Sequence, residues 1–254
     1  MTPTRREAPA PTTMRVQRAL ARAGLASRRE ADALVAAGRV RVNGEIATVG
    51  QIVDPQVDSL SVDGRTVARP STKATWLVLN KPSGVMTTRR DPQGRETVFD
   101  LIPNAPRAIT YVGRLDYLTE GVLLLTTDGD AANALTHPSR AIERTYVATV
   151  RGPVGAAVRA LRSGFELDDG PVEVVAVDAE ASGDRRWALT ITLTEGRNRE
   201  VRRICEALDL SMERLVRTQF GPVTLGGLPI GQTRALTPRE RSMLDALSKR
   251  IDHL

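Results

Sequence analysis

Hydrophobic and polar residues alternate most regularly in residues 186–193, where the sequence reads RWALTITL. A period of two residues is typical of a half-buried β-strand. Similar β-rich stretches predict strands, which together cover residues 76–80, 108–115, 122–126, 145–151, 172–179 and 187–194. Helices are predicted at residues 130–136, 154–163, 198–208 and 238–250. Because these strands do not alternate regularly with long helices, the pattern predicts an α+β fold with a mixed or antiparallel sheet.

The first 75 residues carry two helix signals. The first predicted helix covers residues 14–23 and ends at Gly24. The second begins with a capping box, in which the side chains of Ser27 and Glu30 each accept a hydrogen bond from the other's backbone amide. This helix is predicted to stop at Gly38. Its core side is predicted to consist of Ala31, Leu34 and Val35.

Two hairpin signals follow these helices. Asn43-Gly44 and Asp63-Gly64 each stand between β-rich stretches, and such pairs favour the tight turns of β-hairpins. The segment 68–75 is polar, contains proline and is typical of a linker. The chain is therefore predicted to consist of a disordered tail at residues 1–13, a small two-helix and hairpin domain at 14–72, and a larger domain at 73–254.

The positive charge of the chain is concentrated in the small domain. The formal net charge is +6, and residues 1–75 hold 12 Lys and Arg against 7 Asp and Glu. A basic terminal domain favours a polyanion partner such as RNA, although charge alone also fits a merely soluble basic protein. The candidate phosphate contacts in this domain are Arg28, Arg29, Arg39 and Arg41.

The composition excludes several kinds of chemistry. The single cysteine, Cys205, leaves no internal disulfide framework and no cysteine-rich zinc site. Histidine occurs only at His137 and His253, so a histidine-rich metal centre is also excluded, and no metal or organic cofactor is expected. No apolar run approaches the roughly 20 residues of a membrane span, and no secretory signal opens the chain. We therefore expect a cytoplasmic protein with no membrane partner.

A candidate catalytic carboxylate follows a predicted strand. In the sequence VGRLDYLTEGVLLLTTDG, Asp116 lies between two apolar strands, so it can stand near apolar walls and still reach solvent. Arg114 points to the same side of an extended chain, two residues earlier. The alternative is that Asp116 caps a turn and that Arg114 is its surface partner.

A second cluster lies at residues 194–208, TEGRNREVRRICEAL. Helical periodicity places a core stripe on one face of this segment, made of Val201, Ile204, Cys205 and Leu208. Arg199 and Arg203 lie on the opposite face, toward solvent or RNA. Arg202 lies at the border, where its guanidinium can hold a catalytic carboxylate ionised. A plain solvated basic face explains Arg199 and Arg203 as well, but Arg202 less well.

Two further residues are candidates whose role the pattern leaves open. Tyr146 is one of eight Tyr, Phe and Trp residues, and it is either a core residue or a stacking surface for a flipped base. Lys81, in NKPSG, follows a strand and is either a structural cation or a cation that faces phosphate.

Four blocks in one order resemble a known enzyme family. They are NKPSG at 80–84, GRLD with TEG and LLLTTDG at 113–129, HPS at 137–139 with Tyr146, and EGRNREVRR at 195–203. Together they resemble the pseudouridine synthases of the RsuA/RluB/RluE/RluF family, and the form EGRNREVRR with FGPV at 220–223 is similar to the large-subunit-rRNA branch. Residues 27–44 resemble the S-four RNA-binding domain that this family carries.

The resemblance implies roles for the candidate residues. It implies that Asp116 is the nucleophile, that Tyr146 stacks on the target base, and that Arg202 pairs with Asp116. It also implies that Arg114 fills the space vacated by the flipped uridine. Further RNA contacts are expected from Lys81, Arg197 and Arg199. Leu118 departs from the family, many members of which have Asp or Asn there, and this puts a local hydrogen bond of the loop in doubt.

The implied function is isomerisation of a specific uridine in 23S rRNA, or in a ribosome-assembly intermediate, by a monomer. Three alternatives stay open: a synthase for small-subunit rRNA, a non-catalytic RNA-binding assembly factor, and another carboxylate enzyme such as a hydrolase. The last requires a second catalytic carboxylate or a metal cluster, and the sequence offers no convincing pair.

Overall fold

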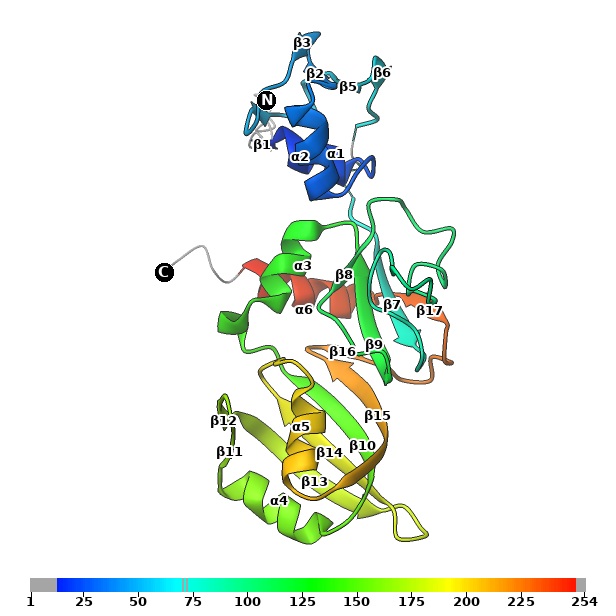
Figure 1. Cartoon of the computed structure of the whole chain (residues 1–254), viewed down its shortest axis with the longest axis vertical. Helices are drawn as coiled ribbons and strands as arrows, with labels where there is room; N and C mark the ends of the chain where they lie inside the picture. The colour runs from blue at the N-terminus through cyan, green and yellow to red at the C-terminus, as the bar shows by residue number, and fades with distance from the viewer. Residues whose placement is uncertain (1–12, 70, 72, 250–254) are drawn as a thin grey trace, which may run out of the picture. The chain divides into compact units, whose positions relative to one another are not determined.

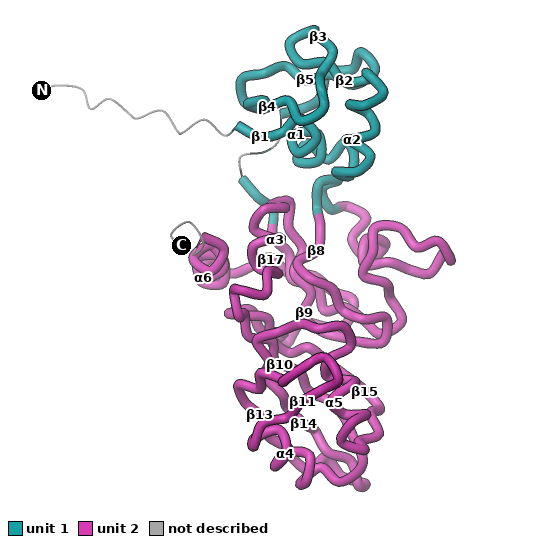
Figure 2. Tube along the Cα trace, turned by 60° about the vertical axis from the view of Figure 1, so that its left-hand side comes forward, with its two compact units in different colours: residues 1–75, 105–109 teal, residues 76–104, 110–254 magenta. Residues whose placement is uncertain are grey.

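The computed structural model describes residues 13–69, 71 and 73–249. These residues divide into two compact units, which Figure 2 colours separately. Unit 1 contains the described residues up to Thr75 together with Ala105–Ile109, and unit 2 contains Trp76–Asn104 and the chain from Thr110 onward. The segment Ala105–Ile109 had been predicted to belong to the larger domain. The predicted disordered tail, apart from Thr13, and the last residue of the predicted helix 238–250 lie outside the described residues.

Unit 1 combines two helices with short antiparallel strands (Figure 1). Strands β3, β2, β5 and β6 form one sheet in that order, and β1 pairs with β4. Both helices pack on the core of this unit, which includes Val16, Leu20, Ala31, Val35, Val40, Val53 and Leu60. The elements are β1 (Met14–Arg15), α1 (Val16–Arg22), α2 (Arg28–Ala36), β2 (Val40–Val42), β3 (Glu45–Ile46), β4 (Ile52–Val53), β5 (Leu60–Val62) and β6 (Arg65–Thr66).

The local signals of unit 1 are confirmed, with one difference at its start. Glu30 N donates to Ser27 Oγ at 3.3 Å and Ser27 N to Glu30 Oε2 at 2.8 Å, so the predicted capping box forms. The turns β2–β3 and β5–β6 form at the predicted dipeptides. Met14–Arg15, however, is a strand and not the start of α1, because it pairs with Ile52–Val53. That pairing is distant in sequence, and the periodicity gives no sign of it.

Unit 2 is built on a nine-stranded mixed sheet, which confirms the predicted α+β class. Its order is β13–β14–β10–β15–β9–β7–β17, with β16 beside β15 and β8 beside β9. The strands are β7 (Trp76–Lys81), β8 (Thr110–Val112), β9 (Thr119–Thr126), β10 (Arg144–Arg151), β13 (Val174–Ala181), β14 (Trp187–Leu193), β15 (Ser211–Phe220), β16 (Val223–Thr224) and β17 (Thr233–Ala235). A separate hairpin consists of β11 (Phe165–Leu167) and β12 (Gly170–Val172).

Helices α4 (Val154–Ser163) and α5 (Glu200–Ala207) share one core with strands β10, β13, β14 and β15 (Figure 1). The predicted stripe of α5 is confirmed, since Val201, Ile204 and Cys205 are buried in this core and Leu208 packs against it. Elsewhere, α3 (Gly129–Thr136) packs against β8 and α6 (Pro238–Lys249). The short 3-10 helix η1 (Pro138–Arg140) follows α3.

The longest strand, β15, is the main element that the sequence pattern missed. Its sequence, SMERLVRTQF, mixes charged with apolar residues, so it lacks the regular alternation of apolar and polar residues that marks a half-buried strand. It nevertheless lies between β10, to which it is antiparallel, and β9, to which it is parallel. A Cβ atom on Gly121 of β9 would come within 2.2 Å of the carbonyl oxygen of Arg217, so only glycine permits this close approach of the two strands.

Candidate active site

One pocket of unit 2, with a volume of about 420 Å³, collects residues from distant parts of the sequence. Six arginines and three carboxylates line it, so its charge is markedly positive. Residues of three of the four sequence blocks line the pocket, namely those at 113–129, at 137–139 with Tyr146, and at 195–203. Strand β15 contributes further lining residues. The lining residues that carry charge, aromatic or hydroxyl groups are Arg114, Asp116, Thr119, Thr136, Arg144, Tyr146, Thr194, Glu195, Arg197, Arg199, Glu200, Arg202, Arg217 and Phe220.

Asp116 lies in the loop between β8 and β9, with its side chain exposed at the pocket. Leu115 before it is buried, so Arg114 and Asp116 both lie on the exposed side of an extended segment, as the sequence predicted. The loop is closed by a hydrogen bond from Thr119 N to the Asp116 carbonyl at 3.0 Å. On the buried side, Thr87 Oγ1 donates to the Leu115 carbonyl at 2.8 Å. The position of the Asp116 carboxylate is therefore set by a well-bonded backbone.

Lys81 binds this loop from its buried side. The sequence predicts that it contacts RNA, but its side chain does not reach the surface. Its side chain is 0% exposed. The ammonium donates to the carbonyl oxygens of Pro82 at 2.9 Å, Asp116 at 3.2 Å, Tyr117 at 3.2 Å and Thr119 at 2.9 Å. Burial lowers the pKa of this ammonium to about 8, while the nearby carboxylates of Asp116 and Glu120 oppose the shift. The structure corrects the RNA-binding prediction in favour of the structural alternative.

Arg202 reaches the same pocket, but it does not form the expected ion pair. Its Nη2 donates to Thr119 Oγ1 at 3.4 Å. Within the part of the chain that the structure describes, no ion pair of 4 Å or less joins Arg202 to Asp116. Thr119 is the first residue of β9, three residues after Asp116, so Arg202 contacts the end of the loop that carries Asp116 without forming an ion pair with its carboxylate.

Tyr146 lies on β10 and is half-buried, with part of its surface at the pocket and part against the core of α4 and α5. The ring packs on the core and also lines the cavity, and its role as a stacking surface for a base stays a prediction. In the sheet it stands between Ile191 of β14 and Arg217 of β15. Arg144, two residues earlier on the same strand, also lines the pocket.

Sequence reasoning missed two buried arginines of this pocket, Arg144 and Arg217. The guanidinium carbons lie 5.3 Å and 5.2 Å from the centroid of the Phe220 ring, respectively. Arg144 Nη1 donates to the carbonyls of Ile142 and Thr194, and burial lowers the pKa of its guanidinium. The sequence shows Arg217 only as an arginine in a β-rich stretch. Its position in the pocket becomes evident only once β15 is known to be a buried strand.

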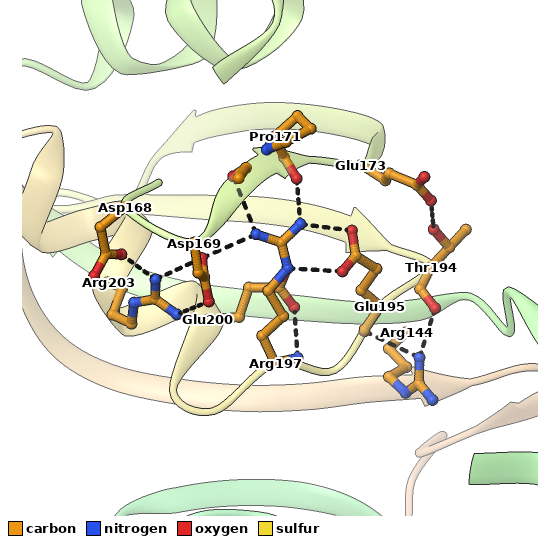
Figure 3. Close-up of polar contacts among 11 residues, drawn as sticks. Arg144, Asp168, Asp169, Pro171, Glu173, Thr194, Glu195, Arg197, Glu200 and Arg203 are labelled. Carbon is orange, nitrogen blue, oxygen red and sulfur yellow. Dashed lines mark hydrogen bonds and ion pairs between the residues drawn. The ribbon is translucent and has the colours of Figure 1, made fainter. Parts of the chain in front are cut away.

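The loop before α5 is tied to the β11–β12 hairpin by a dense polar network (Figure 3). Arg197 Nε and Nη2 donate to the Glu195 carboxylate at 2.7 and 2.9 Å, and Nη1 donates to Asp169 at 3.0 Å. Its remaining contacts are with the carbonyls of Gly170 and Pro171. All the donor groups of this guanidinium are thus occupied within the protein. Arg197 therefore has a structural role in this network, and its contact with RNA stays a prediction.

Arg203 belongs to the same network, and not to a free basic face. It contacts Asp168 and forms an ion pair with Asp169, Nη2 to Oδ1, at 2.7 Å. These bonds lower the pKa of the Asp169 carboxyl well below its ordinary range, with the hydrogen bond from Arg203 as the largest cause. Arg199, by contrast, is exposed at the pocket and has only a 3.4 Å contact with Glu206, so its availability to RNA stays a prediction.

Glu200, the first residue of α5, is a buried carboxylate next to this loop. It accepts a hydrogen bond from Arg197 N at 3.2 Å through Oε2, whereas its buried Oε1 has no hydrogen-bond partner in the described structure. Burial raises the pKa of this carboxyl above its usual value. Among the described residues, no group of three or more His, Cys, Asp or Glu side chains is placed to hold a metal ion.

Comparison with known proteins identifies the family. The model of the RNA pseudouridylate synthase family matches residues 75–207, and that of the S4 domain matches residues 14–58. The chain belongs to the RNA pseudouridylate synthase family. It is accordingly an isomerase, and the resemblance seen in the sequence blocks is confirmed.

Individual relatives of this pseudouridine synthase match along most of the chain. An RNA pseudouridine synthase of Mycobacterium bovis is 44% identical over 242 residues, which cover 92% of this chain and 94% of the relative. Ribosomal large subunit pseudouridine synthase B of Escherichia coli is 44% identical over 225 residues, covering 85% and 77% of the two chains. A crystal structure of a pseudouridylate synthase matches with a TM-score of 0.62 at 28% identity, covering 91% of this chain and 99% of the other.

Leu118, the residue at which this synthase departs from the family pattern, lies on the surface of the Asp116 loop. Its side chain is 55% exposed, next to the exposed Tyr117. The backbone bond from Thr119 to Asp116 closes the loop here, and it needs no polar side chain at position 118. The doubt about a missing loop hydrogen bond therefore does not extend to the position of Asp116.

The four candidate arginines of the S4 domain lie on its surface. Arg28 and Arg29 are exposed in the first turn of α2. Arg39 donates to both oxygens of Asp63, at 2.8 and 2.5 Å, and Arg41 Nη1 donates to the Gly44 carbonyl at 2.8 Å. All four side chains are exposed, and their contact with RNA stays a prediction. No helix in the described part of the chain has the length and apolar character needed to cross a membrane.

Proposed function

We propose that this pseudouridine synthase isomerises a specific uridine of large-subunit ribosomal RNA, with Asp116 as the nucleophile. The observation that carries the proposal is the meeting of Asp116, Tyr146 and Arg202 in one arginine-rich pocket, although they come from three separate blocks of sequence. The choice of large-subunit RNA is supported by the relative named ribosomal large subunit pseudouridine synthase B. Because the proposed substrate is ribosomal RNA, we place the activity in the cytoplasm.

The pocket suits a single extruded nucleotide. Its volume of about 420 Å³ falls within the range of sites that enclose small ligands. A uridine inside a folded RNA must leave its stack before a protein carboxylate can reach it. Tyr146 then provides a half-buried ring on which the uracil stacks. Arg114, exposed at the same pocket, is free to occupy the space that the uridine leaves in the RNA.

The reaction rearranges one bond and moves one proton. The bond between N1 of uracil and C1′ of ribose breaks, and its electron pair stays on the base. Asp116 assists either as a nucleophile at C1′ or the ring, or by promoting a glycal. The base then rotates, C5 bonds to C1′, and the proton lost from C5 is balanced by the proton gained at N1. No external reactant is consumed.

Arg202 supports Asp116 indirectly, through its contact with the loop that carries this residue. Its contact with Thr119 places a guanidinium beside the segment that carries Asp116, and a modest side-chain rearrangement would let it pair with the carboxylate when RNA binds. The S4 domain contributes phosphate contacts, for which Arg28 and Arg29 are the exposed candidates. Phosphate contacts of this kind position a protein on RNA without selecting a base.

Asp116→Asn tests this function. The change nearly preserves shape and removes the charge and the nucleophilicity, so pseudouridine formation on 23S rRNA should fall to background while the melting temperature and RNA affinity stay close to wild type. Pseudouridine mapping of rRNA from a strain that lacks the gene identifies the nucleotide. A folded Asp116→Asn protein with normal turnover would refute the mechanism. A missing modification in small-subunit rRNA, or wild-type protein that binds rRNA without modifying it, would instead support one of the two alternatives.

A further inference from the structure

Arg217 is a buried cation whose charge the protein leaves uncompensated. Its side chain is 2% exposed. Nε donates to the Val122 carbonyl at 2.8 Å, and the guanidinium lies over the Phe220 ring. Nη2, however, is buried without a hydrogen-bond partner in the described structure. Within the same described residues, no ion pair includes Arg217.

The charged neighbours of Arg217 do not supply the missing anion. Arg144, whose guanidinium also lies over the Phe220 ring, is itself a cation. The Glu195 carboxylate is engaged with the Arg197 guanidinium, and Glu200 accepts a hydrogen bond from Arg197 N. Among the described residues, none of the pocket carboxylates, Asp116, Glu195 and Glu200, forms an ion pair with Arg217. A buried charge that lacks a partner is costly, so a native structure that retains one points to a ligand that completes it. The residue lines the pocket, and a substrate there can supply that partner.

The backbone of Arg217 is held rigidly for such a role. It pairs with Tyr146 of β10 on one side and with Gly121 of β9 on the other. The absent side chain of Gly121 permits the close approach that fixes the Arg217 carbonyl. A donor held in place before the reaction needs no reorganisation when charge develops, and this is the condition for strong electrostatic catalysis.

The sheet register places this guanidinium beside the proposed base platform. Arg217 and Tyr146 are opposite each other on adjacent strands, so their side chains leave the sheet on the same face. Both line the pocket. A uracil stacked on Tyr146 therefore has the Arg217 side chain as its neighbour, and its O2 and O4 atoms are the acceptors of suitable chemistry.

We infer that Arg217 is a catalytic residue that stabilises the detached uracil as an anion. When the N1–C1′ bond breaks, the electron pair left on the base spreads over N1, O2 and O4. The Arg217 guanidinium, which lines the pocket, donates to one of these oxygens and offsets the developing negative charge, which is later lost when C5 bonds to C1′. This role rests on the proposed function, because it requires a uridine in the Asp116 pocket.

The test compares two substrates whose bases differ in stability as anions. Fluorine at C5 withdraws electrons, so 5-fluorouracil leaves more readily than uracil and needs less help from a cation. Arg217→Gln should lower the single-turnover rate on uridine RNA by about 10²-fold or more, the range found when a donor to developing charge is removed. On RNA with 5-fluorouridine at the target, the loss should be several-fold smaller. The assay follows consumption of the target nucleoside after nuclease digestion.

Two further variants complete the design. Arg214 is an exposed arginine of the same strand that does not line the pocket. Arg214→Gln should therefore leave both rates unchanged. Arg217→Lys keeps a positive charge, should lose less than Gln, and provides the same substrate comparison if Gln prevents folding. Equal losses on the two substrates, or no loss, would overturn the inference. Wild-type protein that is inactive on uridine RNA would instead contradict the proposed function, so the two failures are distinguishable.

Discussion

Replacement of the buried Lys81 by methionine should disturb the loop of Asp116 far more than it disturbs RNA binding. Methionine keeps a similar length and removes the ammonium that donates to four carbonyls. Because three of these carbonyls belong to Asp116, Tyr117 and Thr119, the loop that carries Asp116 loses its internal support. We expect the turnover rate to fall at least tenfold while the dissociation constant for rRNA stays within about twofold, since Lys81 itself is inaccessible to RNA.

The cost in stability can be worked from the same contacts. The partners of the ammonium are carbonyls, so the cost is that of buried carbonyls left without donors, about 1–3 kcal/mol each, and removal of the buried charge offsets part of it. A loss of about 4 kcal/mol lowers the melting temperature of a domain of this size by about 10 °C. Lys73→Met, at an exposed lysine, is the matched control and should change the melting temperature by less than about 2 °C.

The pH dependence gives a second and independent check. Folding lowers the pKa of Lys81 from 10.5 to about 8, so between these values the unfolded chain binds more protons than the folded chain. The free energy of unfolding therefore rises with pH through this window, by up to about 3 kcal/mol from this group alone. Activity should fall in the same window, because a neutral amine has at most two hydrogens for four carbonyls.

Unfolding by urea at several pH values, on wild type and Lys81→Met, isolates this group from all others. The rise in stability between pH 8 and pH 10.5 should be larger in wild type, and the difference between the two proteins is the contribution of Lys81. Parallel curves would refute the assignment of the shift to Lys81. A Lys81→Met protein with wild-type turnover would refute the claim that the ammonium supports an Asp116 loop on which activity depends.

The remaining predictions concern base stacking and phosphate contacts. Tyr146→Phe should keep more single-turnover activity than Tyr146→Ala, since only alanine removes the ring under the uracil; equal activities would show that Tyr146 is a core residue alone. The double change Arg28→Gln and Arg29→Gln should weaken rRNA binding and reduce the slope of log affinity against log salt by about 1 to 2, because phosphate contacts are lost. An unchanged slope in filter-binding titrations would remove these two residues from the RNA interface.

Signals that lie within a few residues of one another could be predicted from sequence. The capping box at Ser27 forms. The sequence Thr237-Pro238-Arg239-Glu240 has the same Ser/Thr-x-x-Glu pattern, and it also forms a capping box, in which Glu240 N donates to Thr237 Oγ1 at 3.2 Å and Thr237 N donates to Glu240 Oε2 at 2.8 Å. Helix α4 has the predicted bounds, 154–163. In the site, Arg114 and Asp116 were placed correctly relative to each other because Leu115 between them is apolar.

Residues whose role depends on a distant partner could not be assigned in this way. Arg197 and Arg199 are two positions apart and of the same type, yet the first is enclosed and the second exposed. The difference comes from Asp169, which lies 28 residues before Arg197 and reaches it only through the β11–β12 hairpin. In the same way, the role of Lys81 depends on carbonyls 35–38 residues away, and no short pattern in the sequence contains that information.

Strand β15 also determines when this enzyme becomes complete during its own synthesis. The pairs β10–β14 and β7–β9 can form from chain made earlier, but these two parts of the sheet meet only through β15, which ends at Phe220. Until then each part has an open edge, and open edges are prone to wrong pairing. Arg217 and Phe220 also reach Tyr146 only at this stage. At about 5–20 residues per second, the nascent chain spends several seconds with an unfinished pocket, so we expect no modification of RNA by a chain that still lacks this strand.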